Sequence, residues 1–256
     1  MQLDGEQSLG RHVLQLRRLL TPWGKIGVVT EHPTLVLLHG LAGSGALWDG
    51  LDAASQWDGP VVAPDLAGHG AATPLERYSF GALAARVAAA LDPDQPVAVL
   101  GHSLGGVVAL ALASGWFGVR VTSVVALGVK LSWSPDELAK GRALGAKPPK
   151  VFETRAEAEA WAGRLAGLPS GPVTEFGGGW RAAVDPRAFA VGRPDLPGLL
   201  AAARARVTLA AGERDTMSPV EQLRTLVPNP VVLPDVGHNA HVEDPAATAV
   251  LLEYLR

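Results

Sequence analysis

The sequence contains no cysteine among its 256 residues. Disulfide bonds, zinc sites with thiolate ligands and cysteine nucleophiles are therefore excluded. The net charge is only -3, and no long run of one sign occurs, which argues against nucleic acid or an anionic membrane as the main partner. The metal-binding spacings H-x-H and H-E-x-x-H are also absent, so a metal site has little support.

Long hydrophobic runs are missing too. The first twelve residues contain an early acidic residue and no apolar run, so we expect no signal peptide. The longest apolar stretches, such as 107–113, are far too short to span a bilayer. We therefore expect a soluble, cytoplasmic protein that does not act on a membrane.

Hydrophobic residues make up 48% of the chain, which is enough for a full core. Between residues 34 and 128, short strand-like runs alternate with longer helix-like runs, and the strand-like runs are apolar throughout. That pattern predicts a doubly wound parallel sheet buried on both faces. The expected strands are 35–38, 61–63, 97–100 and 121–127, the expected helices are 79–91 and 104–114, and a leading hairpin is expected over 12–20 and 25–30.

The alternation stops over residues 129–193, which show no clear strand. Capping-box spacings that begin at Ser134 and Thr154 predict two helices there. We interpret the stretch as a small helical cap insertion, with 1–128 and 194–256 as the two parts of one core. The alternation then resumes, and the expected elements are a strand at 207–211, a helix from Ser218 to about 227, a strand at 230–233 and a closing helix at 240–255.

The segment Gly101-His102-Ser103-Leu104-Gly105 matches the pattern G-x-S-x-G between an expected strand and an expected helix. In that context the serine sits on a sharp, strained turn that exposes its hydroxyl at the carboxyl edge of the sheet. Glycines on both sides avoid side-chain collisions in such a turn. We therefore predict that Ser103 is a nucleophile.

A serine hydroxyl is a weak nucleophile and needs a base. His238 follows the last expected strand, at the same edge of the sheet as Ser103, and we predict that it is the base. His241 is the fallback, with a surface or supporting role expected for it. The base needs an acid to fix its tautomer, and Asp215 follows the penultimate strand. Glu213 is the neighbouring decoy, and Asp235 lies too near His238 along the chain.

Two glycine-containing loops follow the first two core strands. His39-Gly40-Leu41-Ala42-Gly43 predicts half of an oxyanion hole, made by the backbone N–H groups of Leu41 and Leu104, with His39 holding the loop. The second loop is Asp65-Leu66-Ala67-Gly68-His69-Gly70. It lacks a phosphate-binding pattern, and we expect a tight surface turn near the site.

Together, His39-Gly40, Asp65-x-x-Gly68-x-Gly70, Gly101 to Gly106, Gly212-x-x-Asp215 and Gly237-His238 resemble the α/β-hydrolase superfamily. The likeness is greatest to its small, capped esterase and C–C-bond hydrolase branch. It implies an α/β-hydrolase fold with a mostly parallel, eight-stranded, doubly wound sheet and a small helical cap inserted after strand 6. It also implies a triad in the chain order Ser, acid, His, and neither cofactor nor metal.

The predicted cap holds three of the seven tryptophans, Trp133, Trp161 and Trp180. Packing onto the core explains most of such residues, but together with Trp48 some of them are candidates to line a substrate pocket. We expect a largely apolar pocket of modest size.

The predicted function is hydrolysis of a carboxylic ester of a small, largely apolar molecule through an acyl-enzyme. The fold hosts many reactions, so C–C bond hydrolase, lactonase, thioesterase, perhydrolase and hydroxynitrile lyase activities stay open on the same triad. A non-catalytic ligand receptor is the alternative of another class. The presence of all three triad residues favours an enzyme over a receptor.

Overall fold

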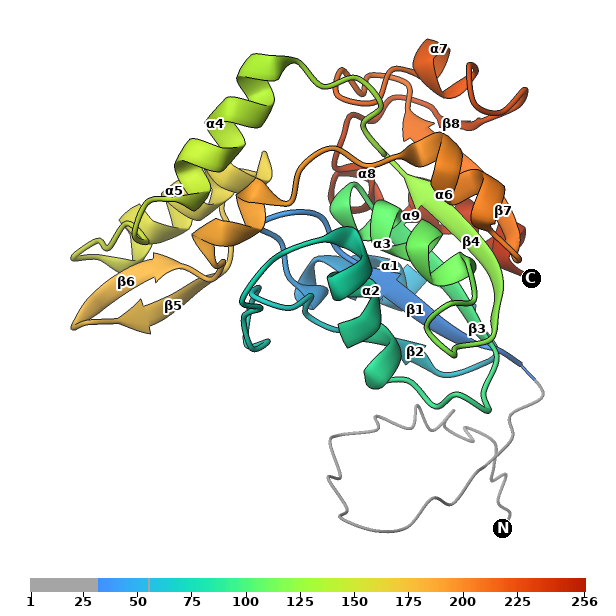
Figure 1. Ribbon diagram of the computed structural model, residues 1–256, viewed down its shortest axis with the longest axis horizontal. Coiled ribbons are helices and arrows are strands. Elements are labelled where there is room, and N and C mark those ends of the chain that lie inside the picture. The colour runs from blue at the N-terminus through green and yellow to red at the C-terminus, as the bar shows by residue number, and fades with distance from the viewer. Residues whose placement is uncertain (1–31, 55) are drawn as a thin grey trace, which may run out of the picture.

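The computed structural model describes residues 32–54 and 56–256. Within them, a single sheet of six parallel strands has the order β2-β1-β3-β4-β7-β8 (Figure 1). The strands are β1 (Thr34–Leu38), β2 (Val61–Val62), β3 (Val97–His102), β4 (Val121–Leu127), β7 (Arg206–Gly212) and β8 (Val231–Leu233). The expected doubly wound parallel sheet is thus confirmed, with six strands in the described residues. The hairpin expected over 12–20 and 25–30 lies outside the described residues.

Both faces of the sheet are buried, as the apolar runs predict. In β1, Val36 and Leu38 belong to a core shared with α2 (Phe80–Ala89) and α3 (Leu104–Ala113). Leu35 and Leu37 point to the other face, where α1 (Asp49–Ala54), α8 (Ala240–Glu243) and η3 (Val250–Leu255) complete a second core. All ten residues of α3 are buried, so the helix that follows Ser103 is fixed on every side.

The segment 129–193 forms a separate group of elements to one side of the sheet, at the left of Figure 1. It contains α4 (Pro135–Gly145), α5 (Arg155–Ala166), β5 (Val173–Phe176), β6 (Gly179–Ala182) and η2 (Pro186–Ala190). The two predicted helix starts are confirmed, because Ser134 and Thr154 each form a complete capping box. α4 contains no buried residue, whereas all ten residues of α3 in the core are buried.

The expectation that 129–193 lacks strands is wrong. β5 and β6 form an antiparallel hairpin, and the two residues between them, Gly177 and Gly178, have φ values of 59° and 80°. A two-residue turn with two positive φ angles suits the right-handed twist of a hairpin, and glycine adopts it without strain. The three consecutive glycines therefore make a hairpin turn.

Two helices near the C-terminus are shorter than expected. The closing stretch 240–255 is divided into α8, α9 (Pro245–Ala249) and η3, because Asp244 precedes a proline and has the non-helical angles φ -147° and ψ 88°. α7 (Val220–Leu223) ends before 227. Ser218 does not cap α7, since its hydroxyl instead donates to the Val129 carbonyl oxygen at 2.7 Å.

One remaining helix, α6 (Leu196–Ala202), begins at the capping residue Asp195 and packs against α3 through the buried Leu196. η1 (Gly45–Trp48) follows the loop after β1. No helix in residues 32–54 and 56–256 has both the length and the apolar character that crossing a lipid bilayer requires.

Candidate active site

Ser103 occupies the turn between β3 and α3. Its backbone angles, φ 50° and ψ -112°, lie outside the regions that a residue with a side chain normally adopts. The turn is held because the Ser103 N–H donates to the Leu127 carbonyl oxygen of β4 at 2.8 Å. Strained backbone of this kind persists only where the surrounding structure enforces it, and it is typical of functional sites.

Two glycines make this turn sterically allowed. A Cβ atom on Gly101 would lie 2.2 Å from the Gly105 carbonyl oxygen, and one on Gly105 would lie 2.2 Å from the Leu38 carbonyl oxygen. Both distances are far below van der Waals contact. The glycines of G-x-S-x-G are therefore required because β3, α3 and the end of β1 approach one another backbone to backbone.

His238 and Asp215 meet at the carboxyl edge of the sheet. His238 Nδ1 lies 2.8 Å from Asp215 Oδ2, and the Asp215 side chain is fully buried. Burial raises the pKa of Asp215, but the hydrogen bond from His238 and those from the N–H groups of Ser218 and Met217 together hold it below its usual range. Because an ionised carboxylate only accepts, His238 carries its proton on Nδ1 and presents a lone pair on Nε2.

The other acidic candidates lie elsewhere. Glu213 accepts a hydrogen bond from the Asp235 N–H at an exposed position, and Asp235 forms an ion pair with Arg214. Neither carboxylate contacts His238. Of the three acids that the sequence places near this edge, the structure brings Asp215 to the imidazole.

His241, expected at the surface or in a supporting role, is not at the surface. It is only 1% exposed, its ring centre lies 4.4 Å from those of both Trp48 and His102, and neither of its nitrogens has a hydrogen-bond partner among the described residues. Burial lowers the pKa of His241 to about 3, so the ring is neutral at physiological pH. His241 therefore packs against His102 and Trp48 as a buried, uncharged ring.

His102 has a role that the sequence did not indicate. Its side chain is buried, and its Nε2 donates to the His238 carbonyl oxygen at 2.8 Å. Burial, followed by the charges of His241 and His238, holds the pKa of His102 well below its usual range. The residue beside the candidate nucleophile thus fixes the backbone of the candidate base. Pattern alone could not reveal this contact, because it joins positions far apart in the chain.

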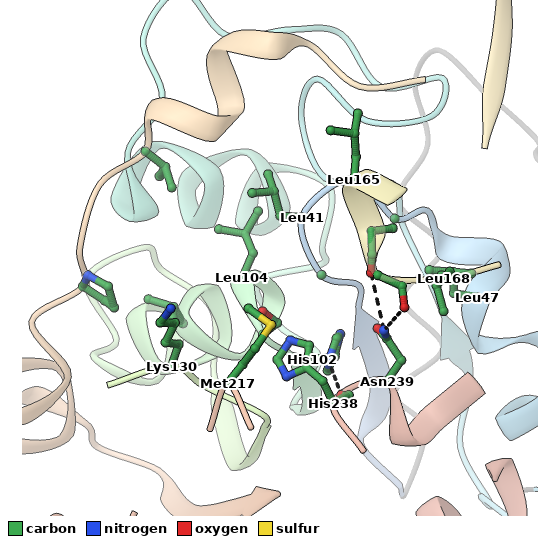
Figure 2. A pocket seen from close by; sticks show the side chains of 18 of the residues that line it. Leu41, Leu47, His102, Leu104, Lys130, Leu165, Leu168, Met217, His238 and Asn239 are labelled. Atoms are coloured by element: carbon green, nitrogen blue, oxygen red, sulfur yellow. Dashed lines mark hydrogen bonds between the residues drawn. The ribbon is translucent and has the colours of Figure 1, made fainter. Parts of the chain in front are cut away.

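Of the two predicted oxyanion donors, Leu104 follows Ser103 directly and Leu41 lies in the loop after β1. Leu41 and Leu104 both line the cavity that contains Ser103 (Figure 2). Neither backbone N–H donates to another group among the described residues. The loop after β1 is shaped by a hydrogen bond from the Gly43 N–H to the Gly40 carbonyl oxygen and by a positive φ of 62° at Ala42. Two unpaired N–H groups beside a serine can stabilise an oxyanion.

The loop after β1 is held by a buried histidine, as expected. His39 Nδ1 donates to the Gly40 carbonyl oxygen at 2.7 Å, and His39 Nε2 accepts from the Leu66 N–H at 2.9 Å. Burial, followed by the charge of His69, lowers the pKa of His39 to about 3. His39 therefore joins the loops that follow β1 and β2.

The loop from Asp65 to Gly70 is not the surface turn that the sequence suggested. Leu66 and His69 are both fully buried, and the loop pairs with Val184 of the 129–193 segment. The Asp65 carboxylate accepts from the N–H groups of Gly45 and Ala71 at 2.8 and 2.9 Å. Glycine spacing alone could not distinguish an exposed turn from one that the later segment covers.

The candidate active site opens into a cavity of about 380 Å³ (Figure 2). Its wall includes Ser103 and His238 from the core and Trp133 and Leu168 from the 129–193 segment. The lining is mostly apolar, as expected, but it also includes the side chains of Lys130 and Arg164. Lys130 forms an ion pair with Glu137 and lies 4.8 Å from the Trp133 ring centre.

The four predicted pocket tryptophans have different surroundings. Trp133 lines this cavity, whereas Trp161 lines a second cavity of about 210 Å³. Trp48 lies in the core, 1% exposed, and Trp180 lies on β6, where Arg155 covers its ring at 5.3 Å. Trp48 and Trp180 therefore line neither of these two cavities, and Trp161 lies outside the Ser103 cavity. The face that each ring presents depends on tertiary packing, which composition does not encode.

A further contact joins the candidate base to the 129–193 segment. Asn239 Nδ2 donates to the Gly167 carbonyl oxygen at 2.9 Å and to that of Ala166 at 3.4 Å (Figure 2). These carbonyl groups end α5. The residue after His238 therefore fixes the end of the helix that overhangs the cavity.

The described residues contain no cluster of three or more His, Asp or Glu residues that could hold a metal ion.

Comparison with a family model and with known proteins shows what this chain is similar to. The model of the Alpha/beta hydrolase family matches residues 35–251. Lipase LipV of Mycobacterium tuberculosis is 41% identical over 85 residues, 32% of each chain. A pimeloyl-[acyl-carrier protein] methyl ester esterase of Neisseria meningitidis is 41% identical over 78 residues, 30% of each chain. These alignments cover only about a third of the length of either relative.

The solved structures agree over a larger part of the chain. The thioesterase domain from the curacin biosynthetic pathway is 25% identical, with a TM-score of 0.65 over 90% of this chain and 93% of that domain. The family match spans the strained serine turn, the Asp215–His238 pair and all six strands of the sheet but the first residue of β1. The chain therefore belongs to the Alpha/beta hydrolase family.

Proposed function

We propose that the protein is a serine hydrolase that cleaves a carboxylic ester of a small molecule, with Ser103 as nucleophile, His238 as base and Asp215 as the orienting acid. The observation that carries the proposal is the hydrogen bond between His238 Nδ1 and the buried Asp215, because it leaves the Nε2 lone pair free in the cavity that also contains Ser103. The names of relatives called lipase and esterase support the same reaction class.

The mechanism has two halves. His238 Nε2 removes the proton of the Ser103 hydroxyl as the oxygen attacks the ester carbonyl carbon. The N–H groups of Leu41 and Leu104 stabilise the negative charge on the carbonyl oxygen. His238 then protonates the leaving alcohol, and an acyl group remains on Ser103. Water, activated by the same base, attacks the acyl-enzyme and regenerates the serine.

Asp215 serves this cycle by staying ionised. Its hydrogen bonds from two backbone N–H groups leave one carboxylate oxygen for His238 Nδ1. The charged carboxylate then stabilises the imidazolium that forms in each half of the cycle. His102 holds the carbonyl group of the same histidine, so both the side chain and the backbone of His238 are fixed.

The test is hydrolysis of p-nitrophenyl esters, from acetate to long-chain acyl groups, by the wild type and Ser103→Ala. We expect the substitution to lower kcat by about 10⁴-fold or more. The Ser103 hydroxyl has no hydrogen bond to another described group, so thermal unfolding should be nearly unchanged. Near-normal turnover by Ser103→Ala would contradict the assignment.

A further inference from the structure

A second cavity lies beside the candidate active site. It encloses about 210 Å³, and every residue of its wall belongs to the 129–193 segment. Its apolar wall includes Trp161 of α5, Val184 after β6 and Phe189 of η2. A cavity with such a lining is suited to an alkyl chain or a flat apolar group.

The two cavities share one side chain. Leu165 lines both the Ser103 cavity and the second cavity, whereas Trp161 lines only the second and Arg164 only the first. All three residues lie on one side of α5, because positions three and four apart are neighbours on a helix surface. α5 is thus the partition between the cavities, and Leu165 is the point where they adjoin.

The charges around the second cavity have one sign. Lys147 and Lys150 are its only charged lining residues, and within the described residues neither ammonium group has a carboxylate in ion-pair range. Lys150 lies 4.7 and 5.1 Å from the ring centres of Phe152 and Trp161, which fixes its position without neutralising it. Of the two cationic residues of the first cavity, Lys130 is neutralised by Glu137, whereas Arg164 has no ion pair within the described residues.

We propose that the two cavities form one substrate site, in which the second cavity binds the far end of the acyl chain and that end carries a carboxylate. The substrate class is then an ester of an apolar chain with a terminal anion. The ester group lies at Ser103, the chain passes Leu165, and Lys147 and Lys150 bind the anion. This assignment rests on the proposed function and refines the largely apolar pocket expected from the sequence.

The experiment compares two matched series of p-nitrophenyl esters. One series has straight-chain acyl groups that end in a methyl group, and the other has chains of the same length that end in a carboxylate. For each length the readout is the ratio of kcat/KM for the carboxylate-ended ester to that for the methyl-ended ester. We expect the wild-type ratio to reach about tenfold at one preferred length, the lower range for a hydrogen bond to a charged group.

Two variants locate the origin of that ratio. In Lys147→Met/Lys150→Met we expect the ratio to fall to about one at every length. The matched control is Lys140→Met on the exposed α4, which lines neither cavity and should keep the wild-type ratio. A wild-type ratio near one at all lengths, or a raised ratio that persists in the double variant, would overturn the proposal.

Leu165→Trp tests the passage between the cavities. A larger side chain at the partition should shift the preferred length of the carboxylate-ended esters to shorter chains, and an unchanged preference would contradict the path past Leu165. The outcomes separate the two proposals. If no ester shows Ser103-dependent turnover, the proposed function fails. If neutral esters turn over but the carboxylate has no effect, only the two-cavity site fails.

Discussion

The doubly wound core and the 129–193 segment contribute to the same cavity with very different packing. In the core, all ten residues of α3 are buried, and the turn at Ser103 is bounded by backbone atoms of three elements. In the segment, α4 buries no residue, and α5 buries only the small residues Ala158, Ala162 and Gly163. The comparison indicates that the reacting groups are held by densely buried elements of the core, whereas the two helices of the segment bury few or no side chains.

This division explains where change should be tolerated. A displacement of the base or the nucleophile by about 1 Å can lower the rate a hundredfold, so these groups lie on dense, buried elements. The segment is connected to the base mainly through Asn239 and the end of α5. Substitutions in the core should therefore affect turnover and folding, and substitutions in the segment should affect substrate preference.

After the loss expected for Ser103→Ala, the largest effect is expected at Asp215, on the core side of the comparison. Asp215→Asn should lower kcat by about 10⁴-fold, because an amide that donates to His238 Nδ1 favours the tautomer with its proton on Nε2. The amide oxygen can still accept from the N–H groups of Met217 and Ser218. Ester hydrolysis and thermal unfolding, measured together, test this. Near-normal turnover would show that Asp215 does not orient the base.

The second effect contrasts two glycines, one from each region. Gly105→Ala should lower the free energy of unfolding by about 3 kcal/mol or more, because its Cβ would lie 2.2 Å from the Leu38 carbonyl oxygen. Gly177→Ala, in the hairpin turn, should lower it by about 1 kcal/mol, because its Cβ meets no atom within 4 Å and only the positive φ is unfavourable.

Urea denaturation of both glycine variants gives the comparison directly. Equal destabilisation at Gly105 and Gly177 would mean that the serine turn is no more constrained than the hairpin. That result would contradict the claim that the core holds the reacting groups more tightly than the 129–193 segment is held.

The third effect is on the pH dependence of stability. The folded-state pKa of His241 is lowered to about 3 from an ordinary value of 6.5, so between these values the unfolded chain binds a proton that the folded chain does not. The free energy of unfolding should therefore fall as the pH falls from 6.5 towards 3, by about 1 kcal/mol per pH unit from this residue. His39, lowered to about 3 as well, adds to the same slope.

His241→Phe isolates that contribution. The substitution keeps a ring beside Trp48 and His102 and removes two buried nitrogens that have no hydrogen-bond partner in residues 32–54 and 56–256. Stability at neutral pH should be nearly unchanged or higher, and the decrease between pH 6.5 and 4.5 should become smaller. A variant whose stability falls with pH as steeply as the wild type would contradict the neutral, buried state of His241.

The sequence predicted those parts of the fold that local pattern encodes. The apolar runs 35–38, 97–100 and 121–127 have the composition of strands buried on both faces, and each is a parallel strand. Because parallel strands end at one edge, the sequence also indicated which chain segments would meet around Ser103. The capping boxes at Ser134 and Thr154 succeeded for a similar reason, since all their contacts lie within one turn.

The parts that sequence missed depend on contacts between distant segments. The strands of the β5–β6 hairpin have four residues each and lie partly exposed, so they carry little periodic signal. Trp133 and Trp161 both belong to the 129–193 segment, yet packing turns them toward different cavities. The bond from His102 to the His238 carbonyl oxygen crosses 136 positions of the chain. No local pattern specifies such a pairing.

The most direct test of the account is where a fluorophosphonate attaches to the protein. The intact mass and the peptide masses should be measured after reaction of the wild type, with Asp215→Asn in parallel. The account predicts a single adduct on the peptide that contains Ser103, formed much more slowly in the variant because the base is no longer oriented. An adduct at another residue, or none on active-site peptides of the folded wild type, would contradict the claim that Ser103 is the activated nucleophile.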